Sequence, residues 1–304
     1  MIMKPTIVVA LGGNALLRRG DQLDCPTQLK NIKIAASAIA RLSRNYRVAI
    51  VHGNGPQVGL LALQNLAYSE VSPYPLDVLG AESQGMIGYL LTQELNNLLT
   101  ESQITTLLTR IEVDPNDPSM QDPSKFVGPI YSQEQAATLA EQHGWTVKAD
   151  GNAFRRVVAS PKPKNILDKP AIQTLLAADG IVICCGGGGI PVQPTPNGYQ
   201  GVEGVIDKDL AAQLLAQQLD ADKLMILTDA DAVYLKWGTP GQQALNSVSV
   251  EELKQYNFAA GSMGPKVEAA CQFVRATGSE AYIGSLEHGL DVLAGKAGTR
   301  VYQP

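Results

Sequence analysis

The sequence has few charged residues and only a small excess of one sign. Charged residues make up 17% of the 304 residues, and the formal net charge is −5. Such a chain has no general affinity for nucleic acid or acidic membrane surfaces, so an anionic ligand must be held by local donors. No apolar run is long enough to span a membrane, and residues 1–6 lead straight into a predicted strand without a secretion signal. We therefore expect a cytoplasmic enzyme.

Reactive side chains are also scarce. The four cysteines form no C-x-x-C pair and no metal-ligand spacing, and Cys184 and Cys185 end an apolar run, where small buried residues are expected. Of the three histidines, His52 follows a predicted strand, and a structural hydrogen bond is expected there rather than catalysis. No Ser-His-Asp or Cys-His arrangement is visible, so the sequence gives little support to an acid-base hydrolase.

The common nucleotide-binding motifs are missing as well. The sequence contains no G-x-x-x-x-G-K-[ST] and no strict G-x-G-x-x-G, and Gly53, Gly55 and Gly59 form only a looser spacing. No acidic residue ends a second strand where it could hold a ribose. These absences argue against a P-loop enzyme and against an NAD-dependent dehydrogenase.

The sequence does contain three short apolar runs that each stop at a cluster of glycines. Residues 7–11 precede Gly12-Gly13-Asn14, residues 48–51 precede His52-Gly53-Asn54-Gly55, and residues 181–185 precede four glycines, 186–189. Each run is typical of a buried parallel strand, and glycine lets the backbone approach a ligand closely. Because ligands of open α/β sheets bind outside the carboxyl ends of the strands, the pattern predicts a phosphate-binding crevice.

The order of the predicted elements is typical of an α/β protein. Helical spacing over residues 27–46 links the first two strands in a β-α-β unit, and a second helix is predicted over residues 82–99. Residues 114–164 interrupt this order with several prolines among polar residues. We interpret them as a small subdomain that covers the crevice, although a solvated decoration is the alternative.

Two lysines are predicted in the first turns of helices. Lys208 follows the expected N-cap Asp207, and Lys266 follows Pro265. The helix dipole disfavours a cation there by roughly 0.3–1 kcal/mol, whereas a bound phosphate makes the same position favourable. Asp209 either orients Lys208 or is an ordinary first-turn acid. With no catalytic base in sight, phosphoryl transfer fits best, because it requires mainly positioning and charge neutralisation.

Ordered blocks along nearly the whole chain resemble the carbamate kinases of the amino-acid-kinase family. The blocks are Val8–Leu16, His52–Gly59, Ser83–Tyr89, Arg155–Val158, Gly186–Pro191, Val205–Ala211, Leu227–Ala230 and Gly261–Val267. The resemblance implies a three-layer αβα sandwich around a mainly parallel sheet of about eight strands. It also implies one domain, 1–304, with a carbamate-binding lobe, 1–180, that carries a protruding subdomain at about 114–164. The nucleotide-binding lobe would be 181–304.

The family's residue roles transfer to matching positions. The resemblance implies that carbamate and the migrating phosphoryl group are held by Gly12, Gly13, Asn14, Gly53 and Asn54. It assigns catalytic roles to Lys208, to Asp209 as its positioning group, and to Lys125, which spacing alone predicts to be a surface lysine. It assigns nucleotide binding to Gly186, Gly187, Thr228, Asp229, Ala230, Tyr234, Met263 and Lys266. No metal-ligand set is implied, because Mg²⁺ would be carried by ATP or ADP. The resemblance also implies a homodimer.

One residue departs from the family, and two other functions compete. The family commonly has proline directly after the subdomain lysine, where this sequence has Phe126, so the rigidity of that loop is open. A kinase for an acylated amino acid is the nearest rival, but such enzymes typically place a lysine before the first glycine pair, where this chain has Ala10 and Leu11. The other rival is a nucleotide-binding regulatory protein without turnover.

Overall fold

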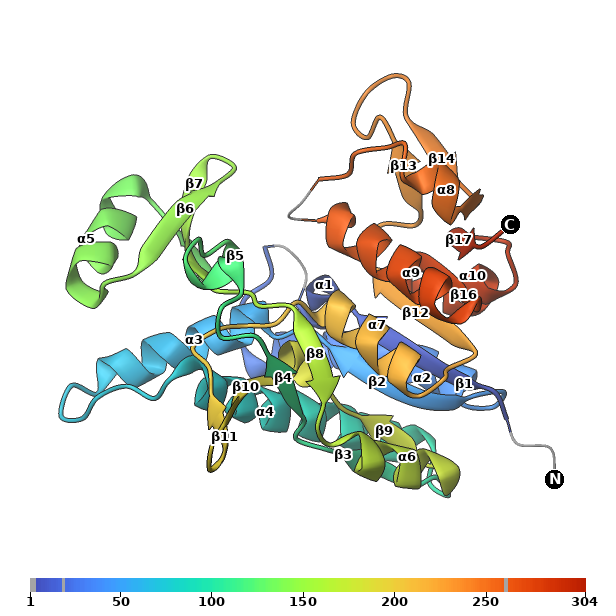
Figure 1. The fold of residues 1–304 in the computed structure, drawn as a ribbon, viewed down its shortest axis with the longest axis horizontal. Coiled ribbons are helices and arrows are strands. Elements are labelled where there is room, and N and C mark those ends of the chain that lie inside the picture. Colours follow the sequence, from blue (N-terminus) through green and yellow to red (C-terminus); the bar gives the residue numbers. More distant parts are fainter. Residues whose placement is uncertain (1–3, 18–19, 260–261) are drawn as a thin grey trace.

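The structure is a computed structural model that describes residues 4–17, 20–259 and 262–304. Within these residues the central sheet has eight strands (Figure 1). Their order is β15 (Ser247–Ser249), β17 (Thr299–Tyr302), β16 (Glu280–Ser285), β12 (Lys223–Thr228), β1 (Thr6–Leu11), β2 (Arg47–His52), β9 (Ile181–Ile183) and β3 (Ile104–Thr106). The strands from β16 to β3 run parallel, and β17 and β15 run in the opposite direction.

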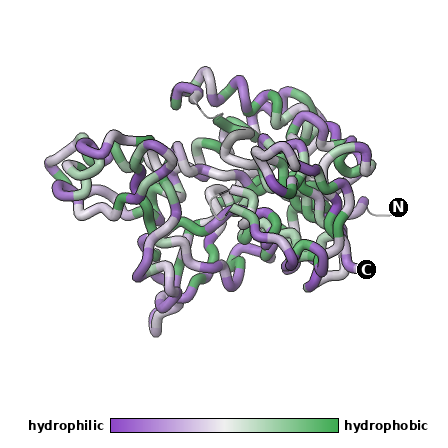
Figure 2. The backbone as a smooth tube through the Cα atoms, turned by 90° about the horizontal axis from the view of Figure 1, so that it is seen from above, coloured by the Kyte–Doolittle hydropathy of each residue, from purple (hydrophilic) through white to green (hydrophobic). Residues whose placement is uncertain are grey.

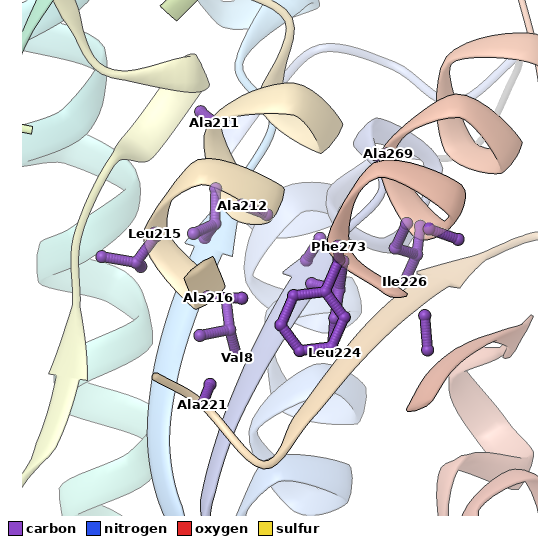
Figure 3. Close-up of a cluster of buried hydrophobic side chains, with 14 of the residues drawn as sticks. Val8, Ala211, Ala212, Leu215, Ala216, Ala221, Leu224, Ile226, Ala269 and Phe273 are labelled. Atoms are coloured by element: carbon purple, nitrogen blue, oxygen red, sulfur yellow. The ribbon is translucent and has the colours of Figure 1, made fainter. Parts of the chain in front are cut away.

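Helices cover both faces of this sheet, which confirms the predicted sandwich. Ile7, Val9 and Leu11 of β1 contribute to one core, whereas Val8 and Ala10 contribute to the other, because successive strand residues point to opposite faces. The first core includes α2 (Cys25–Leu42), α4 (Leu76–Leu98) and α10 (Gly289–Leu293). The second includes α6 (Lys169–Ala177), α7 (Lys208–Gln218), α8 (Val250–Leu253) and α9 (Met263–Thr277), and Figure 3 shows its side chains between α7, α9 and the strands.

Smaller elements lie around the main sheet. A second sheet joins β11 (Gly198–Gly201), β10 (Ile190–Thr195), β4 (Arg110–Val113) and β8 (Pro163–Ile166). A hairpin is formed by β13 (Val233–Leu235) and β14 (Gln243–Leu245). Further short or flanking helices are α1 (Gly13–Leu16), α3 (Gly55–Ala67), η1 (Pro118–Met120), η2 (Gly186–Gly188) and η3 (Leu286–His288).

The predicted excursion contains a sheet of its own. The strands β5 (Lys125–Tyr131), β7 (Ala153–Val158) and β6 (Thr146–Asp150) pair with one another, and α5 (Gln133–His143) packs on them. This unit stands apart from the main sheet in Figures 1 and 2. It joins the main body where β5 meets α3: a Cβ on Gly59 would lie only 1.9 Å from the Cα of Gly128. The close approach therefore requires glycine at position 59, whereas a Cβ on Gly128 would lie 3.4 Å from the Gly59 Cα, an ordinary contact.

Two predicted helices have different boundaries in the structure, and the first of them ends at Leu42 rather than at residue 46. The helix predicted over residues 27–46 is α2, which begins at Cys25 because the side chain of Asp24 accepts a hydrogen bond from the Thr27 N–H at 2.9 Å. The helix predicted over residues 82–99 is α4, which begins six residues earlier. Its first N–H, that of Leu76, donates to the distant Glu203 carboxylate at 2.8 Å, a partner that local spacing does not reveal. In the part of the chain that the structure describes, no helix combines the length and apolar character needed to cross a membrane.

Candidate active site

The ends of β12, β1 and β2 are tied together by the glycines that follow them. The Gly12 N–H donates to the Leu227 carbonyl oxygen at 2.8 Å, and the Gly53 N–H donates to the Leu11 carbonyl oxygen at 3.1 Å. These two amides therefore extend the sheet. The glycine clusters alone suggested that they were free to bind an anion, but both are already hydrogen-bonded. Gly12 is needed for close packing instead, because a Cβ there would lie 3.0 Å from the Leu227 oxygen.

Lys208 is the first residue of α7, and its side chain passes over these strand ends. The helix begins there because Asp207, the predicted N-cap, accepts a hydrogen bond from the Asp209 N–H at 2.8 Å. A Cβ on Gly53 would lie 3.3 Å from both the Lys208 Cδ and the Gly13 N. The stem of Lys208 therefore lies where β1 and β2 end, and its side chain is only 11% exposed.

Asp209 holds two ammonium groups at once. Its Oδ1 lies 2.5 Å from Lys208 Nζ, and its Oδ2 lies 3.3 Å from Lys266 Nζ, although the two lysines belong to different helices. The Asp209 side chain is only 3% exposed, so an ordinary solvated first-turn acid is the wrong interpretation. This buried carboxylate brings together the two lysines that the sequence predicted in first turns, although Lys266 is the fourth residue of its helix, which begins at Met263 and not at Pro265.

The charges of this cluster do not cancel. Burial lowers the pKa of Lys208, Asp209 opposes that effect, and the nearby Lys266 lowers the pKa further. Burial and the second cation both disfavour the charged form of Lys208. An anion that enters the site therefore stabilises this charged form. Two ammonium groups on one carboxylate leave a local charge of about +1 for such an anion.

Lys125 reaches the same region from the protruding unit. It is the first residue of β5, and its Nζ lies 2.5 Å from Asp207 Oδ2, on the residue that caps α7. Its side chain is 31% exposed, so the expectation of a surface lysine, which rested on spacing alone, was wrong. Phe126, which replaces the family's proline, lies inside β5 and pairs with Val157, so strand pairing restrains the backbone beside Lys125.

Asn54 follows the end of β2 by two residues, next to Gly53. Its Nδ2 donates to Ser83 Oγ at 2.7 Å, and Ser83 Oγ donates in turn to the Gly80 carbonyl oxygen at 2.7 Å. The residue is 4% exposed and begins α3 as its N-cap position. The hydrogen bond that Asn54 donates to Ser83 in α4 fixes the orientation of the asparagine side chain, which leaves its carbonyl oxygen and second N–H for other partners.

The glycines after β9 lie beneath this asparagine. A Cβ on Gly187, whose φ is +65°, would lie 2.1 Å from Asn54 Nδ2, and a Cβ on Gly186 would lie 2.4 Å from His52 Nε2. Because β9 neighbours β2 and not β12, Gly186 and Gly187 lie beside the residues that follow β2. Their assignment to the nucleotide stays a prediction.

His52 is a buried structural residue. Its Nδ1 lies 3.0 Å from the Gly53 carbonyl oxygen, and burial lowers its pKa to about 4, although this backbone contact opposes the effect. The imidazole is therefore neutral near pH 7, with Nδ1–H as the donor to Gly53. It is also 0% exposed, so it has no access to a proton from a bound substrate.

The residues predicted to hold the nucleotide follow β12 and begin α9. Thr228 ends β12, and its Oγ1 donates to Asp229 Oδ1 at 2.9 Å. The Tyr234 hydroxyl donates to the Asp231 carboxylate at 2.9 Å, and its ring lies 5.0 Å from that of Trp237. Ala230 lies between Asp229 and Asp231 in the loop after β12, and Trp237 is exposed.

Two further predicted residues lie elsewhere in the site. Met263 is the first residue of α9, one turn before Lys266, and packs against the second core. Asn14 is the second residue of α1, and its side chain lies outside what the structure describes. At Gly13, the first residue of that helix, a Cβ would meet nothing within 4 Å, so the backbone borders open space.

Sequence reasoning missed two partners in the site. Asp207 was predicted only as an N-cap, yet its second oxygen binds Lys125, and Ser83 was recognised only as part of a motif. Spacing could identify the cap but not the pairing, because Lys125 is 82 residues away. In residues 4–17, 20–259 and 262–304, no group of three or more His, Cys, Asp or Glu side chains is arranged to hold a metal ion.

Comparisons with known proteins agree with this geometry. The model of the amino acid kinase family matches residues 5–285. The carbamate kinase of Escherichia coli K12 is 58% identical over 294 residues, which cover 97% of this chain and 98% of that protein. That of Haemophilus influenzae is 52% identical and covers 97% and 96%. The solved structure of carbamate kinase from Giardia lamblia bound to AMP-PNP has a TM-score of 0.91 at 41% identity and covers both chains completely.

Proposed function

The chain belongs to the amino acid kinase family, and from this premise we propose that it is a carbamate kinase. It catalyses the reversible transfer of a phosphoryl group between ATP and carbamate, with ADP and carbamoyl phosphate on the other side. The observation that carries the proposal is Asp209, which holds the ammonium groups of Lys208 and Lys266 above the ends of β1 and β2. The similarity to a carbamate kinase that binds AMP-PNP supports ATP as the donor.

The acceptor lies on the β2 side of Lys208. Asn54, oriented by Ser83, and the backbone of Gly13 and Gly53 border the space where a small planar acid fits. The carbamate oxygen is already anionic, so it attacks phosphorus without a general base, consistent with the burial and neutrality of His52. Neither Ala10 nor Leu11 offers the cation that kinases of acylated amino acids typically place before the first glycine pair.

The lysines stabilise the phosphoryl group during transfer. In the direction of ATP synthesis, the bond from the carbamoyl oxygen to phosphorus breaks while a β-phosphate oxygen of ADP forms the new bond. Charge spreads over the three equatorial oxygens, and fixed donors stabilise it most when they need not reorganise. Lys208 lies over the strand ends, and Lys266 approaches from the nucleotide side, so the pair spans the path between donor and acceptor.

The nucleotide occupies the β12 and α9 side. Thr228, Asp229, Ala230, Tyr234 and Met263 line that approach, and Lys266 binds its phosphates. Mg²⁺ bound to those phosphates supplies further charge neutralisation. The carboxylates of Asp207 and Asp209 are already paired with lysines and suit that function better than binding a metal ion.

Three broader features complete the proposal. The enzyme works in the cytoplasm, runs toward ATP during catabolism of arginine or another nitrogen compound, and forms a homodimer. Exposed tyrosines, Tyr68, Tyr74 and Tyr89, each more than 60% exposed, support an interface between copies. Light scattering tests the dimer, since a protein of 32.3 kDa at all concentrations would contradict it.

The test of the function is an ATP-forming assay. Purified protein with Mg·ADP and carbamoyl phosphate is expected to make ATP, measured by luciferase, whereas acetyl phosphate is expected to be a poor donor. The reverse direction is tried with N-acetylglutamate as acceptor. Turnover of N-acetylglutamate without ATP formation from carbamoyl phosphate identifies the rival kinase, and no turnover with intact nucleotide binding identifies a regulatory protein.

A further inference from the structure

Asp207 connects two parts of the molecule through its two oxygens. Its Oδ1 accepts hydrogen bonds from the N–H groups of Asp209 at 2.8 Å and Leu210 at 3.4 Å, which begins α7. Its Oδ2 accepts from Lys125 Nζ at 2.5 Å, at the base of the protruding unit. One carboxylate thus fixes both the helix that presents Lys208 and the ammonium group of Lys125.

The pair is sheltered from solvent. The side chains of Lys125 and Asp207 are 31% and 15% exposed. Burial alone would raise the pKa of Asp207, but the charges of Lys125 and Lys208 outweigh it and hold the pKa well below its usual range. The carboxylate is therefore ionised throughout the working pH range, and the contact is a charge-assisted hydrogen bond, which is among the stronger kinds.

Lys125 needs such a partner because its own element does not fix its ammonium group. The backbone of β5 pairs with β7, but a lysine side chain has a flexible four-carbon stem. The ammonium group has three donors, so one can remain on Asp207 while the others reach a phosphoryl oxygen. A lysine fixed in this way loses less rotamer freedom when the substrate binds.

We propose that Asp207 is the positioning residue for Lys125 and sets its ammonium group at the edge of the phosphoryl site while capping α7. This inference rests on the proposed function. Two simpler roles compete with it. In the first, Asp207 acts only as a helix cap. In the second, its negative charge acts on the neighbouring Lys208, whose pKa it raises.

The substitution Asp207→Asn separates positioning from capping. Asparagine caps helices as well as aspartate does, so the melting temperature is expected to stay close to that of the wild type. Loss of the charge-assisted contact is expected to lower kcat/KM for carbamoyl phosphate by about tenfold. Asp207→Ala removes both roles, and it is expected to lower the melting temperature as well.

The matched control is Asp114→Asn. Asp114 has the same two kinds of contact: Oδ1 accepts from the Asn116 N–H at 2.9 Å, and Oδ2 lies 2.7 Å from Lys164 Nζ. Both side chains of this pair are exposed to solvent, so its loss is expected to leave turnover unchanged.

A double-mutant cycle decides between the competing roles. If Asp207 acts through Lys125, Asp207→Asn has almost no further effect on kcat/KM in a Lys125→Ala background. The full tenfold loss in that background would show that the charge acts on Lys208, and this result would overturn the proposal. Unchanged kinetics of the single variant Asp207→Asn would also overturn it. Wild-type ATP formation is measured alongside, so that failure of the proposed function is seen separately.

Discussion

Replacing Lys208 with alanine is expected to lower kcat for ATP formation by at least about a hundredfold, or about 2.7 kcal/mol in activation free energy. Lys208 Nζ lies in a buried site, held by Asp209, above the ends of β1 and β2. An ammonium group fixed there acts on charge that develops in the transition state, so kcat falls more than KM rises. Steady-state kinetics at saturating Mg·ADP measures both constants.

The control for this substitution is Lys169→Ala. Asp168 and Lys169 repeat the Asp-Lys pair at the start of α6, so the two lysines occupy the same helix position. Of these two lysines, Lys208 is the one that pairs with the buried Asp209 carboxylate, so Lys169→Ala is expected to keep normal turnover. Near-normal kcat of Lys208→Ala in a folded protein would mean that the residue is only a first-turn lysine, and the mechanism would have to be abandoned.

A second large effect is expected from Gly59→Ala. The new Cβ would lie 1.9 Å from Gly128 Cα and 2.2 Å from Gly128 N, so α3 and β5 must move apart. Overpacking of this kind costs about 1–3 kcal/mol of unfolding free energy. Since Lys125 lies three residues before Gly128 on the same strand, its ammonium group moves too, and kcat/KM falls together with the melting temperature.

Gly85→Ala in α4 is the corresponding control. A Cβ on Gly85 would meet nothing within 4 Å, so this substitution is expected to stabilise the protein by about 0.5–1 kcal/mol through its helix propensity. Thermal unfolding of both variants, followed by circular dichroism, provides the comparison. Equal stability of Gly59→Ala and the wild type would show that the helix and the strand do not meet as described.

Local sequence patterns were enough to predict the sheet and two of the lysines. The apolar runs are fully buried parallel strands, and a strand of that kind shows as a continuous hydrophobic segment. The starts of α7 and α9 depend on residues next to Lys208 and Lys266, so capping and proline signals placed both lysines in or next to a first turn.

Features that depend on distant residues could not be predicted in this way. Lys125 follows a proline-rich loop and resembles any surface lysine until Asp207, far along the chain, is placed beside it. Gly186 and Gly187 follow β9, and the sequence does not reveal that β9 pairs with β2 rather than with β12. Strand order and partner choice are properties of the whole fold, which local propensity does not determine.

The central claim is that the ammonium groups of Lys208, Lys266 and Lys125 converge on the phosphoryl group in transit. A crystal structure with Mg·ADP, aluminium fluoride and carbamate measures this directly. The account predicts the Nζ atoms of Lys208 and Lys266, and that of Lys125 while still on Asp207, within about 2.7–3.2 Å of ligand atoms around the aluminium. If those nitrogens lay beyond contact distance of a correctly bound analogue, the account would be contradicted.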